Sequence, residues 1–245
     1  MEKKTAFYLG YEINEPLRSR IIETIARINA GGSTDKLSSY AADTLIDITN
    51  SGFLAYYDTP TSLVKLSSTT KRATDAGVHT VQKAIQMVIR KLIKKRSIDD
   101  LKNLAFNLSH LICLNNDNPS DTYACFRIPK SLYDKAQGVI VKVQNDPNPD
   151  LYRHEIIETI EDMIGVGIDM FYTRPVSQAN IGKLTRKAAD VSMGGVQKGI
   201  NGVINRLFRN MDHEELTTLS HYLSTLLHSN VSTYYRVQQA ASEQP

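Results

Sequence analysis

Apolar residues recur along this chain at helical spacing, with polar residues between them. Leu17, Ile21, Ile25 and Ile28 are three or four residues apart, which places them on one face of a helix. The leucines between residues 101 and 111 follow the same spacing. Only the short segment 6–11 carries a weak strand signal. The pattern therefore predicts an all-α fold.

The second half of the chain repeats the first at an offset of 115 residues. Residues 6–115 overlay residues 121–230 without a gap and share 27 identical pairs in 110, where average composition gives roughly 7. We expect an internal duplication that produces two tandem, pseudo-symmetric four-helix units. The first unit would span 1–115, a linker 116–120, and the second unit 121–245 with a short C-terminal tail.

Each unit is expected to contain four helices joined by short connections, as in an antiparallel bundle. The expected helices cover 16–30, 33–57, 62–96 and a segment from 97, and then 129–144, 148–172, 177–210 and a segment from 212. Pro60 and Pro175 should mark a turn, because the residue before a proline is pushed out of the helical region. Ser62 should then cap the third helix. Whether the two units share one core stays open.

Charge is distributed unevenly, although the formal net charge is only +3. Residues 62–96 hold nine Lys or Arg and one Asp, and residues 177–210 hold six and one. The segments before them, 33–58 and 148–172, are acidic. Neighbouring helices could complement each other's charge, or the basic helix could present a surface to phosphates. Over a phosphate surface we favour a solvated face whose cations complement the helix dipole, because the dipole already attracts cations to a helix end.

The candidate phosphate surface lies at the end of the first basic helix. Its residues are Arg90, Lys91, Lys94, Lys95 and Arg96. Few aromatic residues interleave with this cluster, so a platform on which bases stack is not supported. No zinc-finger, KH or RRM signature accompanies it.

A set of polar residues is kept in both halves and forms the second candidate site. It comprises Asp47, Asp75, Gln82 and Lys83, and their counterparts Asp162, Asp190, Gln197 and Lys198. Such a set could line a small-ligand or enzymatic pocket in each unit. A network that fixes how helices align is the more common arrangement, and we favour it.

Glycines and cysteines suggest packing roles. Gly195 and Gly199 form a small-xxx-small pair, which predicts a close helix contact within the chain or across a dimer, since each helical glycine costs up to about 1 kcal/mol. Cys113 and Cys125 do not form a CxxC motif, and Cys113 is expected to be a small buried apolar residue. We therefore expect a reducing, cytoplasmic setting.

The sequence contains no signal for other functional classes. No run approaches 18 apolar residues, and the apolar stretch near the N-terminus is too short for a signal-peptide core, so we expect no membrane association. No motif indicates catalytic residues, a metal site or a cofactor. The sequence thus predicts a non-enzymatic interaction or regulatory protein. It would bind another protein or itself, as a homodimer, with nucleic-acid binding and a small-ligand or enzymatic site as alternatives.

Overall fold

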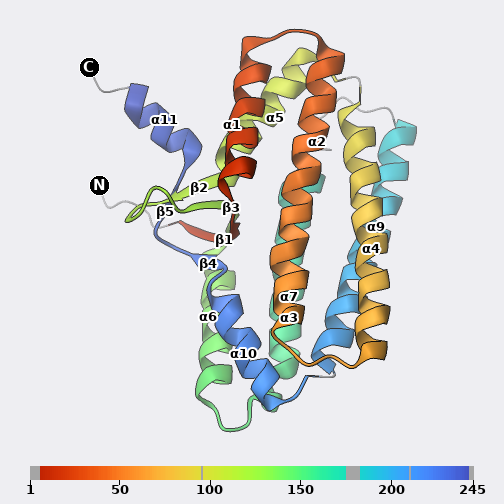
Figure 1. Cartoon of the computed structure of the whole chain (residues 1–245), viewed down its shortest axis with the longest axis vertical. Helices are drawn as coiled ribbons and strands as arrows, with labels where there is room; N and C mark the ends of the chain where they lie inside the picture. The colour runs from red at the N-terminus through yellow and green to blue at the C-terminus, as the bar shows by residue number, and fades with distance from the viewer. Residues whose placement is uncertain (1–5, 95, 175–182, 210, 243–245) are drawn as a thin grey trace. The chain divides into compact units, whose positions relative to one another are not determined.

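A computed structural model describes residues 6–94, 96–174, 183–209 and 211–242 of the chain (Figure 1). It contains two compact units, each assembled from separate stretches of sequence. The first unit comprises Met1–Ser51, Ile89–Arg127 and His228–Pro245. The second comprises Gly52–Val88 and Ile128–Leu227. None of the helices described is both long and apolar enough to cross a membrane.

Helix α1 (Glu15–Ala30) packs against α5 (Ile98–Leu111) in the first unit. Asn14 begins α1 by accepting a hydrogen bond of 3.0 Å from the Leu17 backbone N–H. Gly31 ends α1 with a φ of 81°, which glycine adopts without a Cβ clash. The buried hydroxyls of Thr24 and Thr44 lie 2.8 Å apart and join α1 to α2 (Thr34–Phe53).

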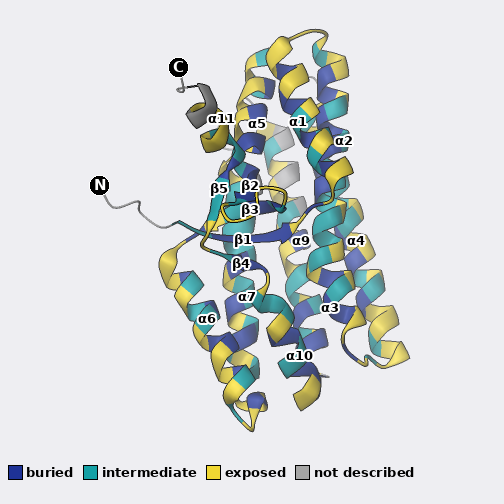
Figure 2. Cartoon of the chain, turned by 60° about the vertical axis from the view of Figure 1, so that its left-hand side comes forward, coloured by how far each residue is buried: buried dark blue, intermediate teal, exposed yellow. Residues whose placement is uncertain are grey.

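A five-stranded sheet belongs to the same unit, in the order β4–β1–β3–β2–β5. The strands are β1 (Phe7–Glu12), β2 (Ile112–Asn115), β3 (Thr122–Ile128), β4 (Leu227–His228) and β5 (Val231–Thr233). β2 pairs antiparallel with β3 on one side and with β5 on the other. Most of β1 is buried (Figure 2). The Tyr11 hydroxyl donates a hydrogen bond of 2.6 Å to the Ile48 carbonyl of α2, and α11 (Tyr234–Ser242) packs on α5.

The chain is mostly helical, as predicted, but this sheet shows that the all-α prediction was wrong in part. The strand signal over 6–11 is confirmed by β1. The other strands are short apolar runs, which periodicity cannot distinguish from the end of a buried helix. Ile112, Cys113 and Leu114, for example, directly continue the apolar pattern of α5.

The second unit is a helical assembly around one apolar core. It contains α6 (Lys130–Asn145), η2 (Pro149–Tyr152), α7 (Arg153–Ile168), α9 (Lys183–Arg209), α10 (His213–Ser224) and most of α4 (Ser68–Ile93). α6 packs against α10 and α7, and α7 packs against α9. The core includes Val78, Val139, Val143, Ile156, Ile204, Leu207, Leu216 and Leu219.

Helix α10 begins in a capping box at Asp212, where a helix was expected to start. The Asp212 carboxylate accepts a hydrogen bond of 2.9 Å from the Glu215 N–H, and the Glu215 carboxylate accepts one of 2.8 Å from the Asp212 N–H. The buried Glu215 carboxylate also accepts a hydrogen bond from the Lys65 N–H. One side chain therefore caps α10 and holds the segment before α4.

The predicted turn at Pro60 is not observed. α2 continues through a π-helical turn, η1 (Leu54–Asp58), into the short α3 (Thr59–Ser62), where Pro60 occupies the first turn and needs no N–H partner. The Tyr222 hydroxyl donates a hydrogen bond of 2.7 Å to the Ala55 carbonyl of η1. Pro175 and Ser177 lie outside the described residues.

The predicted cap of the third helix is also displaced. The Ser62 hydroxyl donates a hydrogen bond of 2.7 Å to the Thr59 carbonyl and caps nothing that follows. Instead, the Ser67 hydroxyl accepts a hydrogen bond of 3.1 Å from the Thr70 N–H and begins α4. The long helix therefore starts at 68 rather than at 62.

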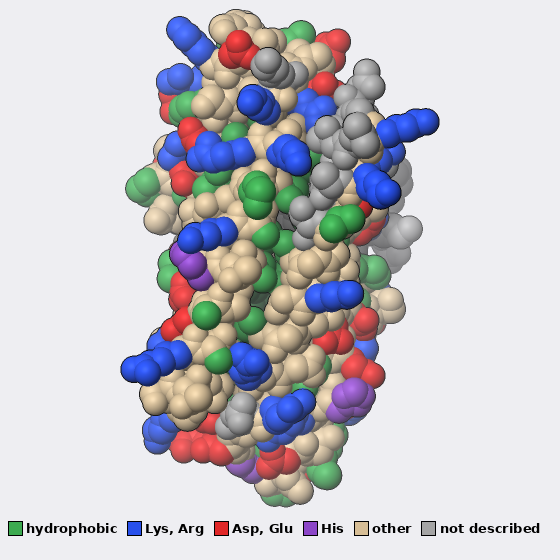
Figure 3. Space-filling view, turned by 90° about the vertical axis from the view of Figure 1, so that its right-hand side faces the viewer, with side chains coloured by type: hydrophobic (Ala, Val, Ile, Leu, Met, Phe, Trp, Pro, Cys, Tyr) green, Lys and Arg blue, Asp and Glu red, His purple; other side chains and the backbone are tan. Residues whose placement is uncertain are grey.

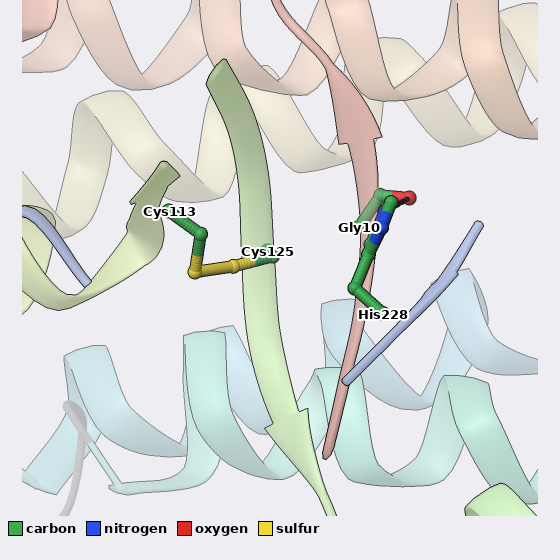
Figure 4. The surroundings of a disulfide bond; sticks show 4 residues. All are labelled: Gly10, Cys113, Cys125 and His228. Atoms are coloured by element: carbon green, nitrogen blue, oxygen red, sulfur yellow. Dashed lines mark hydrogen bonds between the residues drawn. A yellow bond between two sulfur atoms is a disulfide. The ribbon is translucent and has the colours of Figure 1, made fainter. Parts of the chain in front are cut away.

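The two cysteines form a disulfide between β2 and β3, so the prediction of an unpaired Cys113 was wrong (Figure 4). Cys113 pairs in register with Tyr123, which makes Cys125 its diagonal neighbour. Gly10 of β1 lies directly against Cys125, and a Cβ at Gly10 would come within 2.4 Å of the Cys125 Cβ. The His228 ring packs on Tyr123 at 4.3 Å, with its Nε2 3.4 Å from the Gly10 carbonyl.

Elements of the two halves begin at positions that differ by 115 residues. The corresponding starts are Phe7 and Thr122, Glu15 and Lys130, Leu54 and Asp169, Ile98 and His213, and Ile112 and Leu227. The second π-helical turn is η3 (Asp169–Thr173). The offset found in the sequence is thus also the offset between element boundaries.

Candidate functional site: the exposed face of α4 and α9

Helices α4 and α9 each bury one face and expose the other. In α4 the buried residues are Thr74, Val78, Val81 and Val88, at the three-, four- and seven-residue spacing of a single stripe. The Thr74 hydroxyl shares its proton between the Thr70 and Lys71 carbonyls, each at 2.9 Å. Its burial therefore leaves no unsatisfied group. The opposite face is available to a partner.

The two helices approach each other closely within the second unit and run antiparallel there. A Cβ at Gly77 would lie 3.2 Å from Val203, and a Cβ at Gly199 would lie 2.8 Å from Val81. As the contact moves four residues forward on α4, it moves four residues back on α9. The close contact predicted for Gly199 is therefore confirmed, within the chain.

Exposed cations follow a common spacing on both helices. Arg72 and Lys83 lie on α4, and Lys94 directly follows this helix. The cations on α9 are Lys187, Lys198 and Arg209. Successive members are eleven residues apart in both sets, and each member of one set lies 115 residues from a member of the other. We call these six residues the basic strips. Lys94 continues the helical spiral, since its N–H donates a hydrogen bond of 3.1 Å to the Arg90 carbonyl.

The side chains of the basic strips make no ion pair or hydrogen bond with any residue that the structure describes. Figure 3 looks at the side on which α4 and α9 lie, and Lys and Arg side chains are spread along it. α4 contains one acidic residue, Asp75, and α9 contains one, Asp190. Within α4 and α9 themselves, cations thus outnumber carboxylates.

The basic cluster predicted from the sequence overlaps the strips only in part. Arg90 forms an ion pair of 3.2 Å with Asp43 of α2, and the Arg96 Nε donates a hydrogen bond to the Leu92 carbonyl. Lys91 and Lys94 are exposed. Lys95 lies outside the described residues. The interpretation that basic and acidic helices compensate each other thus holds for Arg90 but not for the exposed lysines beside it.

Asp75 of the predicted polar site belongs to a local network. Its carboxylate accepts a hydrogen bond of 2.7 Å from the Tyr57 hydroxyl and lies 3.2 Å from the Lys71 ammonium. Burial raises the pKa of Tyr57 to about 12, and the bond to Asp75 adds to this effect. The phenol therefore acts as a neutral donor that fixes the turn η1 against α4.

Asp47 and Asp162 hold neighbouring helices together in an equivalent way. Asp47 of α2 forms an ion pair with Arg20 of α1. Asp162 of α7 lies 2.7 Å from Lys135 of α6, and this hydrogen bond raises the pKa of Lys135. Arg20 and Lys135 are themselves 115 residues apart. Both pairs connect the first helix of a half to the second.

The remaining members of the polar set lie on α4 and α9. Gln82 is half-buried, whereas Lys83, Asp190, Gln197 and Lys198 are exposed. The three carboxylates Asp47, Asp75 and Asp162 are held by cations or a phenol rather than by one another. Across the described residues, no group of three or more His, Cys, Asp or Glu side chains is placed to hold a metal ion.

Sequence reasoning missed the basic strips, although their signal was present. Lys83 and Lys198 were assigned to the polar set, and Arg72, Lys187 and Arg209 to no site. Comparing only the basic positions across the repeat would have isolated the eleven-residue spacing. No protein family, curated protein or solved structure matches this chain.

Proposed function

We propose that this chain is a non-enzymatic protein that binds a polyanionic macromolecule through the basic strips of α4 and α9. The observation that carries the proposal is the recurrence, at the same spacing along both helices, of three exposed cations that have no partner in the described part of the chain. Structural ion pairs such as Arg90–Asp43 account for other basic residues, but not for these six.

The spacing of the strips keeps their charges from opposing the fold. Eleven residues of helix correspond to about 16 Å, which exceeds the screening length of about 8 Å at physiological salt. The three cations of one strip therefore repel one another little while the protein is free. A polyanion would gain from all six, because each neutralised anion releases condensed counterions.

We further propose that the two strips arose by duplication of a four-helix unit. The repeated ion pairs Arg20–Asp47 and Lys135–Asp162 and the common offset of element boundaries support this proposal. Two equivalent strips on one chain raise the avidity for a long polymer above that of either strip alone. The disulfide between Cys113 and Cys125 removes the cysteine-based argument for a reducing setting, so the cytoplasmic location stays an untested prediction.

A polyanion is a better partner for this face than a second copy of the chain. In a symmetric dimer the same patch of both subunits meets itself. The basic strips would then face basic strips, and like charges would oppose association. This argument leaves self-association through other faces open, but assigns α4 and α9 to an acidic partner.

Heparin tests the proposal, since it is a flexible polyanion without bases. We expect fluorescence anisotropy to show heparin binding that weakens steeply with salt. Lys83→Glu/Lys198→Glu should reduce the affinity at least about tenfold at roughly 0.1 M salt. The matched control is Lys36→Glu/Lys102→Glu, which makes the same charge change at exposed positions of α2 and α5. Equal losses in both variants, or no heparin binding at low salt, would refute the proposal.

A further inference from the structure

We infer that the polyanion is double-helical DNA, held by its phosphates at intervals of half a helical turn. This inference rests on the proposed function, because it specifies what the basic strips bind. It depends on three further observations: the spacing of the cations, the antiparallel contact of α4 with α9, and the small side chains between the cations on α9.

The spacing of the cations matches the repeat of B-form DNA. Eleven residues are close to three helical turns, so Lys187, Lys198 and Arg209 point in nearly the same direction. At a rise of 1.5 Å per residue, the outer two are about 33 Å apart along the axis. One turn of B-form DNA is roughly 34 Å. In a duplex that lies along α9, one DNA strand would place phosphates near Lys187 and Arg209. The other strand would place a phosphate near Lys198.

The contact between α4 and α9 gives the two strips a local two-fold relation. Gly77 lies against Val203 and Gly199 against Val81. Continued along the helices, this antiparallel register places residue 82 opposite 198 and residue 83 opposite 197. Residues 82 and 83 of α4 correspond to residues 197 and 198 of α9 in the sequence repeat. The contact between the two helices is therefore centred on equivalent positions of both. The DNA backbone also has two-fold symmetry, so Lys83 and Lys198, both in the second unit, can make equivalent contacts with one duplex.

The residues between the cations favour contact with the backbone rather than with bases. A Cβ at Gly194, Gly195 or Gly202 would meet no other atom, so α9 is both narrow and open between its cations. A phosphate chain can approach such a surface closely. The exposed residues that the structure describes on the two helices include one ring, His79, and no Tyr or Phe. Stacking of single-stranded bases, which needs aromatic side chains, is therefore not favoured.

The first experiment compares polyanions of different shape. Anisotropy would be measured with a labelled DNA duplex of about 30 base pairs, its single strand, an RNA duplex of the same sequence, and heparin. We expect the DNA duplex to bind at least about tenfold more tightly than the single strand or the RNA duplex, whose A-form grooves space phosphates differently. If the single strand or the RNA duplex bound as tightly as the DNA duplex, the inference would be overturned but the proposed function would stand. Failure to bind heparin and all nucleic acids would remove both.

The second experiment moves the middle cations without changing their number. Ala76 and Val191 are exposed on the same faces and lie seven residues before Lys83 and Lys198. The variant A76K/K83A/V191K/K198A keeps the net charge but destroys the even spacing. We expect its affinity for duplex DNA to fall about tenfold or more while heparin binding is unchanged. Parallel changes with both ligands, or with neither, would contradict the half-turn spacing.

The third experiment tests the equivalence of the strips. Lys83→Glu and Lys198→Glu should weaken duplex binding by the same factor, within about twofold, and each should lower the salt slope by roughly one. A loss confined to one of the two single variants would show that the duplex lies along a single helix and would contradict the two-fold arrangement. Circular dichroism of each variant verifies that the helices remain intact.

Discussion

The two units contain corresponding helices but are stabilised by different interactions. In the first, α1 and α5 belong to a unit with a five-stranded sheet, a disulfide and buried hydrogen bonds such as Tyr11 to Ile48. In the second, the corresponding α6 and α10 contribute to a continuous apolar core. Both units bury apolar side chains, among them Ile21, Ile28 and Leu101 in the first, but the first adds a sheet and a disulfide to this burial.

This difference shows that a repeated helix pattern does not determine which elements pack around each helix. The stripe of α1 and that of α6 both need an apolar cover, but the pattern does not say which element provides it. Loss of the disulfide should therefore affect the first unit, and overpacking of the contact between α4 and α9 should affect the second. Hydrogen exchange by mass spectrometry can assign each effect to its unit.

The largest expected effect is the loss of the disulfide in the first unit. Cys113 and Cys125 are separated by 12 residues. Closing a loop of this size raises the free energy of the unfolded chain by about 3 kcal/mol, because it lowers its conformational entropy. We expect Cys113→Ala/Cys125→Ala to lower the free energy of unfolding by this amount and to increase exchange in β2 and β3. A reductant should destabilise the wild type and leave the double variant unchanged. An equal loss of protection in α6 and α7 would contradict the separate response of the units.

Overpacking of α4 against α9 should have the next largest effect, in the second unit. Gly199→Leu would force a side chain into Val81 and should destabilise the protein by about 2 kcal/mol. The control is Gly195→Ala, whose new Cβ meets nothing and should stabilise α9 by up to about 1 kcal/mol. Urea unfolding measures both. Destabilisation by the control as well would indicate that glycine, rather than the close contact, is needed throughout this helix.

Removal of one helix cap in each unit allows a direct comparison. Asn14→Ala in the first unit and Asp212→Ala in the second should each cost about 1 kcal/mol, because each leaves backbone N–H groups without a partner. Exchange should increase in α1 for the first variant and in α10 for the second. A cost near zero in either unit would show that its helix end is held by packing alone.

The smallest expected effect is a pH dependence of the first unit. Burial lowers the pKa of His228 below its ordinary value of 6.5. The unfolded chain then binds a proton near pH 6.5 while the folded chain does not, so stability is intact above this pH and declines below it. Chemical denaturation between about pH 7 and 5 should show this decline, and His228→Gln should abolish it. A stability that rises on acidification would contradict a neutral, buried imidazole.

Local sequence signals predicted the helices well and their connections poorly. Helices were expected to start at 97 and 212 and to end at 30, and the structure has caps at Ser97, Asp212 and Gly31. The turn at Pro60 was predicted from the same kind of rule. It failed because proline is equally compatible with the first turn of a helix, and only the course of the chain decides between the two positions.

The candidate site shows the same limit. Charge counts along the chain revealed that α4 and α9 are basic, but not which cations are neutralised. Arg90 and Lys91 are adjacent in sequence, yet Arg90 forms an ion pair with Asp43 and Lys91 is exposed. Distinguishing them requires the position of another helix, since an ion pair depends on distance between side chains that are remote in sequence.

The amino-acid sequence by itself determined which segments form helices and the offset of 115 residues at which they recur. Both are written in periodicity and identity along the chain. Only the tertiary structure decided that the apolar segment after α5 becomes a strand, that Cys113 meets Cys125, and that the six exposed cations of the basic strips have no partner among the described residues. These outcomes depend on contacts between distant segments, and the free energy of such contacts cannot be read from local pattern alone.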